Sequence, residues 1–111
     1  MSERLCDIIK TKRKEANLTL TKLAASLDID QSTLSKIENK KRDIPYELVP
    51  KLSKSLDIEL AYLEREYFSE IIAELIYTKD DYALLLELAS DKIKYFRNKR
   101  VQQPNLKFNS Q

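Results

Sequence analysis

The side chains best suited to specific polar contacts stand close together, between residues 31 and 42 of this 111-residue chain. Hydrogen-bonding side chains come first and three consecutive cations follow: Gln31, Ser32, Ser35 and Lys36, then Lys40, Lys41 and Arg42. Such a cation cluster is suited to phosphate, a contact that adds affinity without reading sequence. A polar helix face is more often plain solvent exposure, so the pattern by itself leaves both interpretations open.

Catalytic and metal-binding chemistry has few candidates in this sequence. The chain contains no His and one Cys, which excludes the usual zinc ligand sets and any disulfide within the chain. It also contains no Gly, so a glycine-rich phosphate loop is excluded. Its carboxylates and lysines show no recognisable pairing. We therefore expect neither an enzyme nor a cofactor.

Two short helices are predicted between Leu20 and Asn39. Apolar residues recur at helical spacing in two groups: Leu20, Leu23, Ala24 and Leu27, then Ile29, Leu34 and Ile37. Thr19 and Asp30 stand at the N-cap positions, where a side-chain oxygen can accept from N–H groups that a helix start leaves unpaired. Helices of about eight residues joined by roughly three predict a helix-turn-helix geometry.

Five short segments of this stretch match one pattern in register: Leu23-Ala24, Ile29, Leu34-Ser35, Ile37-Glu38 and Lys41-Arg42. The pattern, L-A-x-x-x-G-[VI]-[ST]-x-x-x-[IL]-S-x-[IL]-E-x-G-x-R, is that of the Cro/phage-repressor (XRE) family of DNA-binding regulators, which the chain resembles over about residues 3–63. Asp28 replaces the glycine of the turn, and Asn39-Lys40 covers the position of the second glycine. Both positions favour positive φ, which Asp and Asn tolerate better than other non-glycine residues. Leu20 replaces a Gln that the family favours, so we expect a polar contact made from there to be absent.

The resemblance implies that the second helix of this pair, Gln31 to about Asn39, which is the third helix of the chain, enters the major groove of double-stranded DNA. The residues expected to read bases are Gln31, Ser32, Ser35 and Lys36. Gln31 suits adenine and Lys36 suits guanine O6/N7, while Ser32 could serve several bases. The residues expected to contact phosphate are Thr19, Thr21, Lys22, Thr33, Asn39, Lys40, Lys41 and Arg42. For Thr33 a capping role alone remains the alternative.

One ion pair is expected to hold this unit together. A first helix is predicted from Ser2, as its cap, to about Ala16. In the resembled family a basic residue at the place of Arg13 pairs with the acid that here is Glu38. An Arg fork that binds a carboxylate through two hydrogen bonds would fix the first helix against the DNA-reading helix. The alternative is a Glu38 that lies on the surface.

Three more helices complete the expected fold. The fourth starts near Tyr46 or Glu47, because Pro50 must lie in its first turn. The fifth runs from Glu59 to Tyr77 and the sixth from Asp80 to about Lys99. We therefore predict an all-α chain: a five-helix repressor-like helix-turn-helix domain over residues 1–63, an αα-hairpin over 64–100 and a flexible tail over 101–111.

The hairpin carries more apolar surface than it can bury by itself. It either folds back on the helix-turn-helix domain or meets a second copy of the chain. We favour a homodimer, since two-fold symmetry would place two reading helices about 34 Å apart, one turn of DNA. The expected interface residues are Tyr67, Phe68, Ile71, Leu75, Leu85, Leu88, Ile93 and Phe96.

Charge and hydropathy fit a cytoplasmic DNA-binding protein. Residues 1–56 hold twelve Lys or Arg against eight Asp or Glu, whereas residues 57–100 hold seven against ten. The half with the helix-turn-helix pattern is thus the basic one. No apolar run approaches ~20 residues, so no membrane span is expected, and the N-terminus lacks a signal-peptide pattern.

Two functions remain open at this point. The first is a sequence-specific transcriptional regulator that binds a palindromic operator as a homodimer, such as a restriction-modification controller or a phage-type repressor. The second is an antitoxin or protein-protein interaction module whose C-terminal helices bind a partner protein. The oligomeric state of the purified chain separates these two functions.

Overall fold

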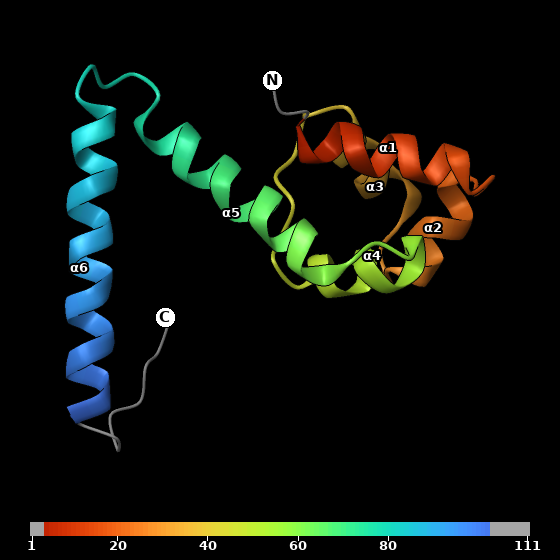
Figure 1. The fold of residues 1–111 in the computed structure, drawn as a ribbon. Helices are drawn as coiled ribbons and strands as arrows, with labels where there is room; N and C mark the ends of the chain where they lie inside the picture. The colour runs from red at the N-terminus through yellow and green to blue at the C-terminus, as the bar shows by residue number, and fades with distance from the viewer. Residues whose placement is uncertain (1–3, 103–111) are drawn as a thin grey trace. The chain divides into compact units, whose positions relative to one another are not determined.

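The computed structural model describes the backbone of residues 4–102 and the side chains of residues 4–100. These residues fold into helices only, in the order α1 (Leu5–Glu15), α2 (Leu20–Ser26), α3 (Gln31–Glu38), α4 (Leu48–Leu56), α5 (Leu60–Ile76) and α6 (Tyr82–Gln102) (Figure 1). The all-α prediction is confirmed. Pro50 lies in the first turn of α4, as expected, and α6 includes the first two residues of the predicted tail, whose remainder lies outside the described residues.

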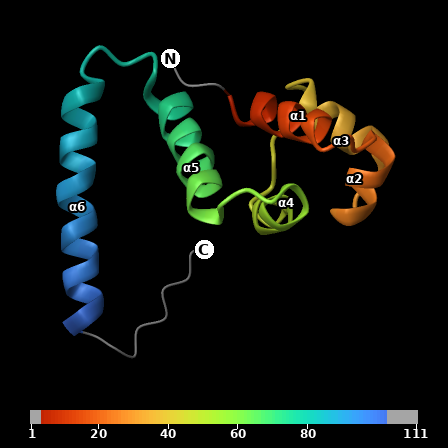
Figure 2. The same ribbon diagram turned by 45° about the vertical axis from the view of Figure 1, so that its right-hand side comes forward.

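The chain forms two compact units, the first ending at Glu74 and the second beginning at Leu75. The first unit holds the hydrophobic core, to which α1, α2, α3, α4 and α5 all contribute. Figure 2 shows the backbone of these helices from a second direction. The largest fully buried side chains of the core are Ile9, Leu23, Leu27, Leu34, Ile37, Val49, Leu52 and Leu63. Helices this short are marginal by themselves, so their stability comes from this shared core. The second unit contains α6.

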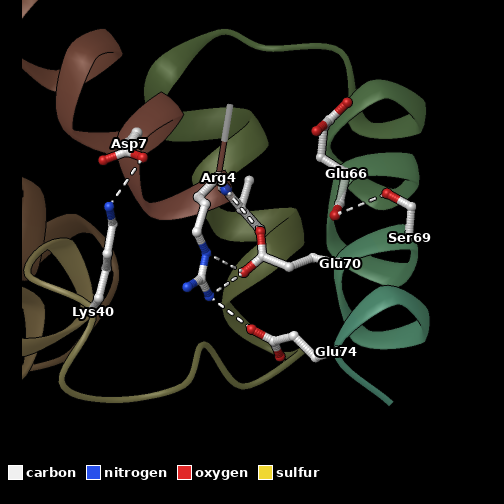
Figure 3. A network of polar contacts seen from close by, with 8 residues as sticks. Arg4, Asp7, Lys40, Glu66, Ser69, Glu70 and Glu74 are labelled. Atoms are coloured by element: carbon white, nitrogen blue, oxygen red, sulfur yellow. Dashed lines mark hydrogen bonds and ion pairs between the residues drawn. The ribbon is translucent and has the colours of Figure 1, made fainter. Parts of the chain in front are cut away.

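The N-terminus of α1 is capped by a residue from α5. Glu70 Oε1 accepts from the Leu5 backbone N–H at 3.0 Å, across 65 positions of sequence. Glu70 Oε2 also accepts from Arg4 Nη2 at 2.6 Å, and Arg4 Nη2 reaches Glu74 Oε2 at 2.8 Å (Figure 3). The hydrogen bond to Glu70 raises the pKa of Arg4. The predicted start of this helix at Ser2 was wrong, because a distant carboxylate supplies the cap; Ser2 itself lies outside the described residues.

Four helices end in a left-handed residue that is not glycine. The residues are Asn17 (φ 57°), Asp28 (φ 60°), Lys40 (φ 64°) and Asp57 (φ 54°). After each one the next backbone N–H closes a six-residue turn, as in Leu18 N to Arg13 O at 3.0 Å and Lys41 N to Lys36 O at 2.8 Å. This is the hydrogen bond of the Schellman motif, which satisfies carbonyls that a helix end leaves unpaired.

The two glycine replacements in the helix-turn-helix pattern behave differently. Asp28 adopts the positive φ that the sequence predicted. After α3 the left-handed residue is Lys40, whereas Asn39 has a φ of −98°. A lysine has no short polar side chain that could stabilise this backbone locally, so the conformation costs about 1–2 kcal/mol. The end of α3 is therefore strained.

We expect Lys40→Gly to unfold at higher urea concentration than Lys40→Ala. Both variants remove the ion pair of Lys40 with Asp7, whose charged atoms lie 3.4 Å apart, so the comparison isolates the backbone. The glycine variant should be more stable by about 1 kcal/mol, since glycine lacks the Cβ that opposes a left-handed residue. Equal urea midpoints and slopes for the two variants would show that the end of α3 is not strained.

Candidate nucleic-acid interface

The helices α2 and α3 each begin with a side-chain cap. Thr19 Oγ1 accepts from the Lys22 backbone N–H at 3.1 Å, and Asp30 Oδ1 accepts from the Thr33 backbone N–H at 2.7 Å. Ser32 Oγ also donates to Asp30 at 3.2 Å. Hydrogen bonding from Thr33, and then from Ser32, lowers the pKa of the Asp30 carboxyl. Asp30 therefore stays ionised at the start of α3, where a negative charge is favourable.

A buried ion pair fixes α3 against α1. Arg13 Nε donates to Glu38 Oε2 at 2.7 Å and Arg13 Nη2 donates to Glu38 Oε1 at 3.0 Å. The third guanidinium nitrogen, Nη1, donates to the Leu18 carbonyl at 2.9 Å, in the loop that leads to α2. Arg13 and Glu38 are only 9% and 4% exposed. The fork expected from the sequence is present, and it joins three parts of the chain.

The Arg13–Glu38 pair and the buried apolar residues occupy one face of α3 and leave the opposite face exposed. Leu34, Ile37 and Glu38 are buried, whereas Gln31, Ser32 and Lys36 are exposed. Ser35 is half-buried and receives a hydrogen bond from Asn39 Nδ2 at 3.4 Å. The four predicted base-reading residues therefore differ: Gln31 and Lys36 are exposed, Ser32 donates to the Asp30 cap, and Ser35 is half-buried.

A hydrogen bond connects the starts of α2 and α3. Thr21 Oγ1 donates to Gln31 Oε1 at 2.9 Å, and both side chains are exposed. Leu20, which stands where the family favours Gln, is half-buried and packs against the core. Leu20 itself makes no side-chain hydrogen bond, and the polar contact between the starts of α2 and α3 comes from the next residue, Thr21. Sequence reasoning assigned Thr21 to phosphate and missed this contact, because it depends on how the two helices meet.

The predicted phosphate-binding side chains fall into two groups. Lys22, Lys36, Lys41 and Arg42 are exposed and form no ion pair with any described residue. Lys40 is exposed but pairs with Asp7, which reduces the charge it offers to a ligand. Thr19 and Asn39 are exposed, and Thr33 is half-buried beside the cap that its backbone completes. The free cations follow α3 and lie along the exposed sides of α2 and α3.

These features coincide with a known domain. Residues 9–63 match the family model described as Helix-turn-helix. Residues 9–63 are a helix-turn-helix domain of the XRE type. This domain belongs to a family of DNA-binding transcription regulators. The predicted boundaries, about residues 3–63, agree closely with the match.

A comparison with solved structures finds two that resemble this chain. The clp gene regulator ClgR from Corynebacterium glutamicum is 22% identical, with a TM-score of 0.51 over 77% of this chain and 88% of ClgR. A complex of SinR protein with SinI protein is also 22% identical, with a TM-score of 0.48 over 92% of this chain and 99% of that chain. A comparison with curated proteins finds no match.

The predicted dimer residues do not share one environment. Tyr67 is half-buried and packs against the core of the helix-turn-helix domain. Its ring lies 5.8 Å from that of Tyr46 and 5.1 Å from that of Phe68, measured between centroids. Tyr46 also donates to Glu64. Tyr67 is therefore a core contact within one chain, a role hidden from the sequence because Tyr46 lies in the segment before α4.

The other predicted dimer residues lie on the surface. Leu85 is half-buried, and the exposed members of the set are Phe68, Ile71, Leu75, Leu88, Ile93 and Phe96. Further exposed apolar side chains of α5 and α6 are Leu60, Tyr62, Ile72, Tyr82, Leu84, Leu86 and Tyr95. Within the described residues, no helix combines the length and the hydropathy that crossing a membrane requires.

Proposed function

We propose that the chain is a sequence-specific transcriptional regulator that binds a palindromic DNA operator as a homodimer. The observation that carries this proposal is the outward polar face of α3, held from behind by the buried Arg13–Glu38 pair. A rigid helix that presents accessible hydrogen-bonding side chains is what base reading in the major groove requires. A restriction-modification controller and a phage-type repressor both fit this description.

Within this proposal the accessible side chains divide by role. Gln31 and Lys36 read bases, since both are exposed on α3 and carry donors that reach base edges. Lys22, Lys41 and Arg42 contact phosphates, because they are exposed and unpaired within the described residues. Ser32 and Ser35 contribute less, as each already has a partner in its own helix or cap.

The apolar surface of the C-terminal helices supports the homodimer. Seven apolar side chains of α6, from Tyr82 to Phe96, are at least 44% exposed, and Leu75 at the end of α5 is 76% exposed. Surfaces of this kind are rare on monomers and mark contacts with another chain. A second copy offers the same surface, so two-fold pairing would bury both at once. Two helix pairs would then form a four-helix bundle.

The same surface supports a second function, in which the C-terminal helices bind a partner protein of different sequence, as an antitoxin does. Size-exclusion chromatography with light scattering separates the two. A stable dimer at micromolar concentration supports the homodimeric regulator, whereas a monomer supports the interaction module. Selection from random duplex oligonucleotides at moderate salt then tests DNA reading. Enrichment of a palindromic motif is the expected result, and the absence of any motif would exclude the proposed function.

Two lysine variants separate base reading from phosphate binding. Lys36→Ala should weaken the preference at one base of each half-site by about 1–3 kcal/mol. Lys41→Ala should weaken binding to all DNA sequences equally, and it should reduce the slope of log Kd against log salt concentration by about 1 per half-site. Lys94→Ala, on α6, is the matched control and should change neither quantity. A uniform loss in Lys36→Ala would show that Lys36 does not read a base.

A further inference from the structure

We infer that Thr21 positions Gln31 for base reading and does not itself bind phosphate. This inference deepens the proposed function and rests on it. Thr21 Oγ1 donates to Gln31 Oε1 at 2.9 Å, and among the described residues this is the only side-chain hydrogen bond between α2 and α3. The contact thus fixes the most exposed end of the reading helix to its neighbour.

The local sequence places the two side chains face to face. Leu20 and Leu23 turn toward the core, so Thr21 points outward from the first turn of α2. Asp30 ends the turn and caps α3, which makes Gln31 the first residue of that helix. The Thr21 hydroxyl and the Gln31 amide are both exposed, and neither side chain forms another hydrogen bond among the described residues.

The chemistry of the amide leaves Gln31 able to read a base while Thr21 holds it. A carboxamide oxygen accepts two hydrogen bonds, and its nitrogen donates two. Thr21 uses one acceptor position, which leaves one acceptor and both donors for the N6 and N7 positions of an adenine. A free glutamine would have to be ordered on binding, which lowers affinity. The Thr21 hydroxyl therefore holds the Gln31 side chain in place before DNA binds.

A double-mutant cycle distinguishes positioning from direct phosphate contact. In the native chain, Thr21→Val should lower affinity for the selected operator about three- to tenfold and flatten the preference at the base that Gln31 reads. In a Gln31→Ala background the same change should have almost no effect. Thr21→Ser, which keeps the hydroxyl, should restore affinity and preference in the native background. Equal losses in both backgrounds, or no loss in either, would overturn the inference.

Two measurements keep this test independent of folding and of the proposed function. The melting temperature of Thr21→Val should equal that of the native chain, since the hydroxyl contacts no core residue. In the free protein, NMR relaxation should show an ordered Gln31 side-chain amide that becomes mobile in Thr21→Val; an amide equally mobile in both would also overturn the inference. A native chain that selects no DNA motif would instead remove the proposed function, and base reading by Gln31 with it.

Discussion

Arg13→Ala or Glu38→Ala will lower the free energy of unfolding by about 3 kcal/mol, because each leaves a buried charge without its partner. Arg13 and Glu38 are 9% and 4% exposed and share two hydrogen bonds of 2.7 and 3.0 Å. A small domain is stable by only about 5 kcal/mol or slightly more. Either variant should therefore unfold near physiological temperature, as thermal melts followed by circular dichroism will show.

The double variant identifies the source of this loss. The double variant Arg13→Ala with Glu38→Ala should lower the free energy of unfolding by clearly less than the sum of the two single variants. The second change removes a charge that is already unpaired. Arg13→Met with Glu38→Leu should recover much of the stability by filling the same volume. Lys12→Ala is the matched control, since its pair with Glu15 is exposed and 3.7 Å long. Additive losses would mean that the two residues act independently.

Leu88→Asp will convert the proposed dimer into a monomer and lower affinity for a palindromic operator about 100-fold. The loss follows from avidity, because two linked reading helices bind far more tightly than one. Leu88 is 44% exposed on α6, so a charge there is hydrated in the monomer but would be desolvated in an apolar interface. Light scattering measures the mass, and titration with labelled operator measures the affinity.

Ser90→Asp provides the control for this variant. It adds the same charge two positions further along α6, on a different side of the helix from Leu88, and should leave mass and affinity unchanged. The helix-turn-helix domain should melt at the same temperature in both variants, since none of the described side chains of α6 belongs to its core. A Leu88→Asp chain that remains dimeric would contradict an interface on α6. A native chain that is monomeric would favour the function of binding a different protein.

The positions where this chain replaces the two glycines of the family pattern show how far residue type predicts backbone conformation. Asp28 was assigned positive φ from its residue type and position, and its φ is 60°. After α3, residue type alone favoured Asn39 within Asn39-Lys40, yet Lys40, which aligns with the second glycine of the family pattern, is the left-handed residue. The difference arises because α3 keeps Glu38 in its last turn, paired with Arg13, and Asn39 follows as its cap. A packed side chain outweighs a backbone preference of about 1–2 kcal/mol.

The sequence by itself determined the helices of this protein, the caps at Thr19 and Asp30 and, through the family pattern, the partners Arg13 and Glu38. Apolar periodicity and capping act within a few residues, so they can be read from the chain. The tertiary structure alone decided that Glu70 caps α1, that Tyr67 packs beside Tyr46, and that Thr21 holds Gln31. Each of these contacts joins groups from separate helices or loops, and only the packing of the helices brings them within hydrogen-bonding or van der Waals distance.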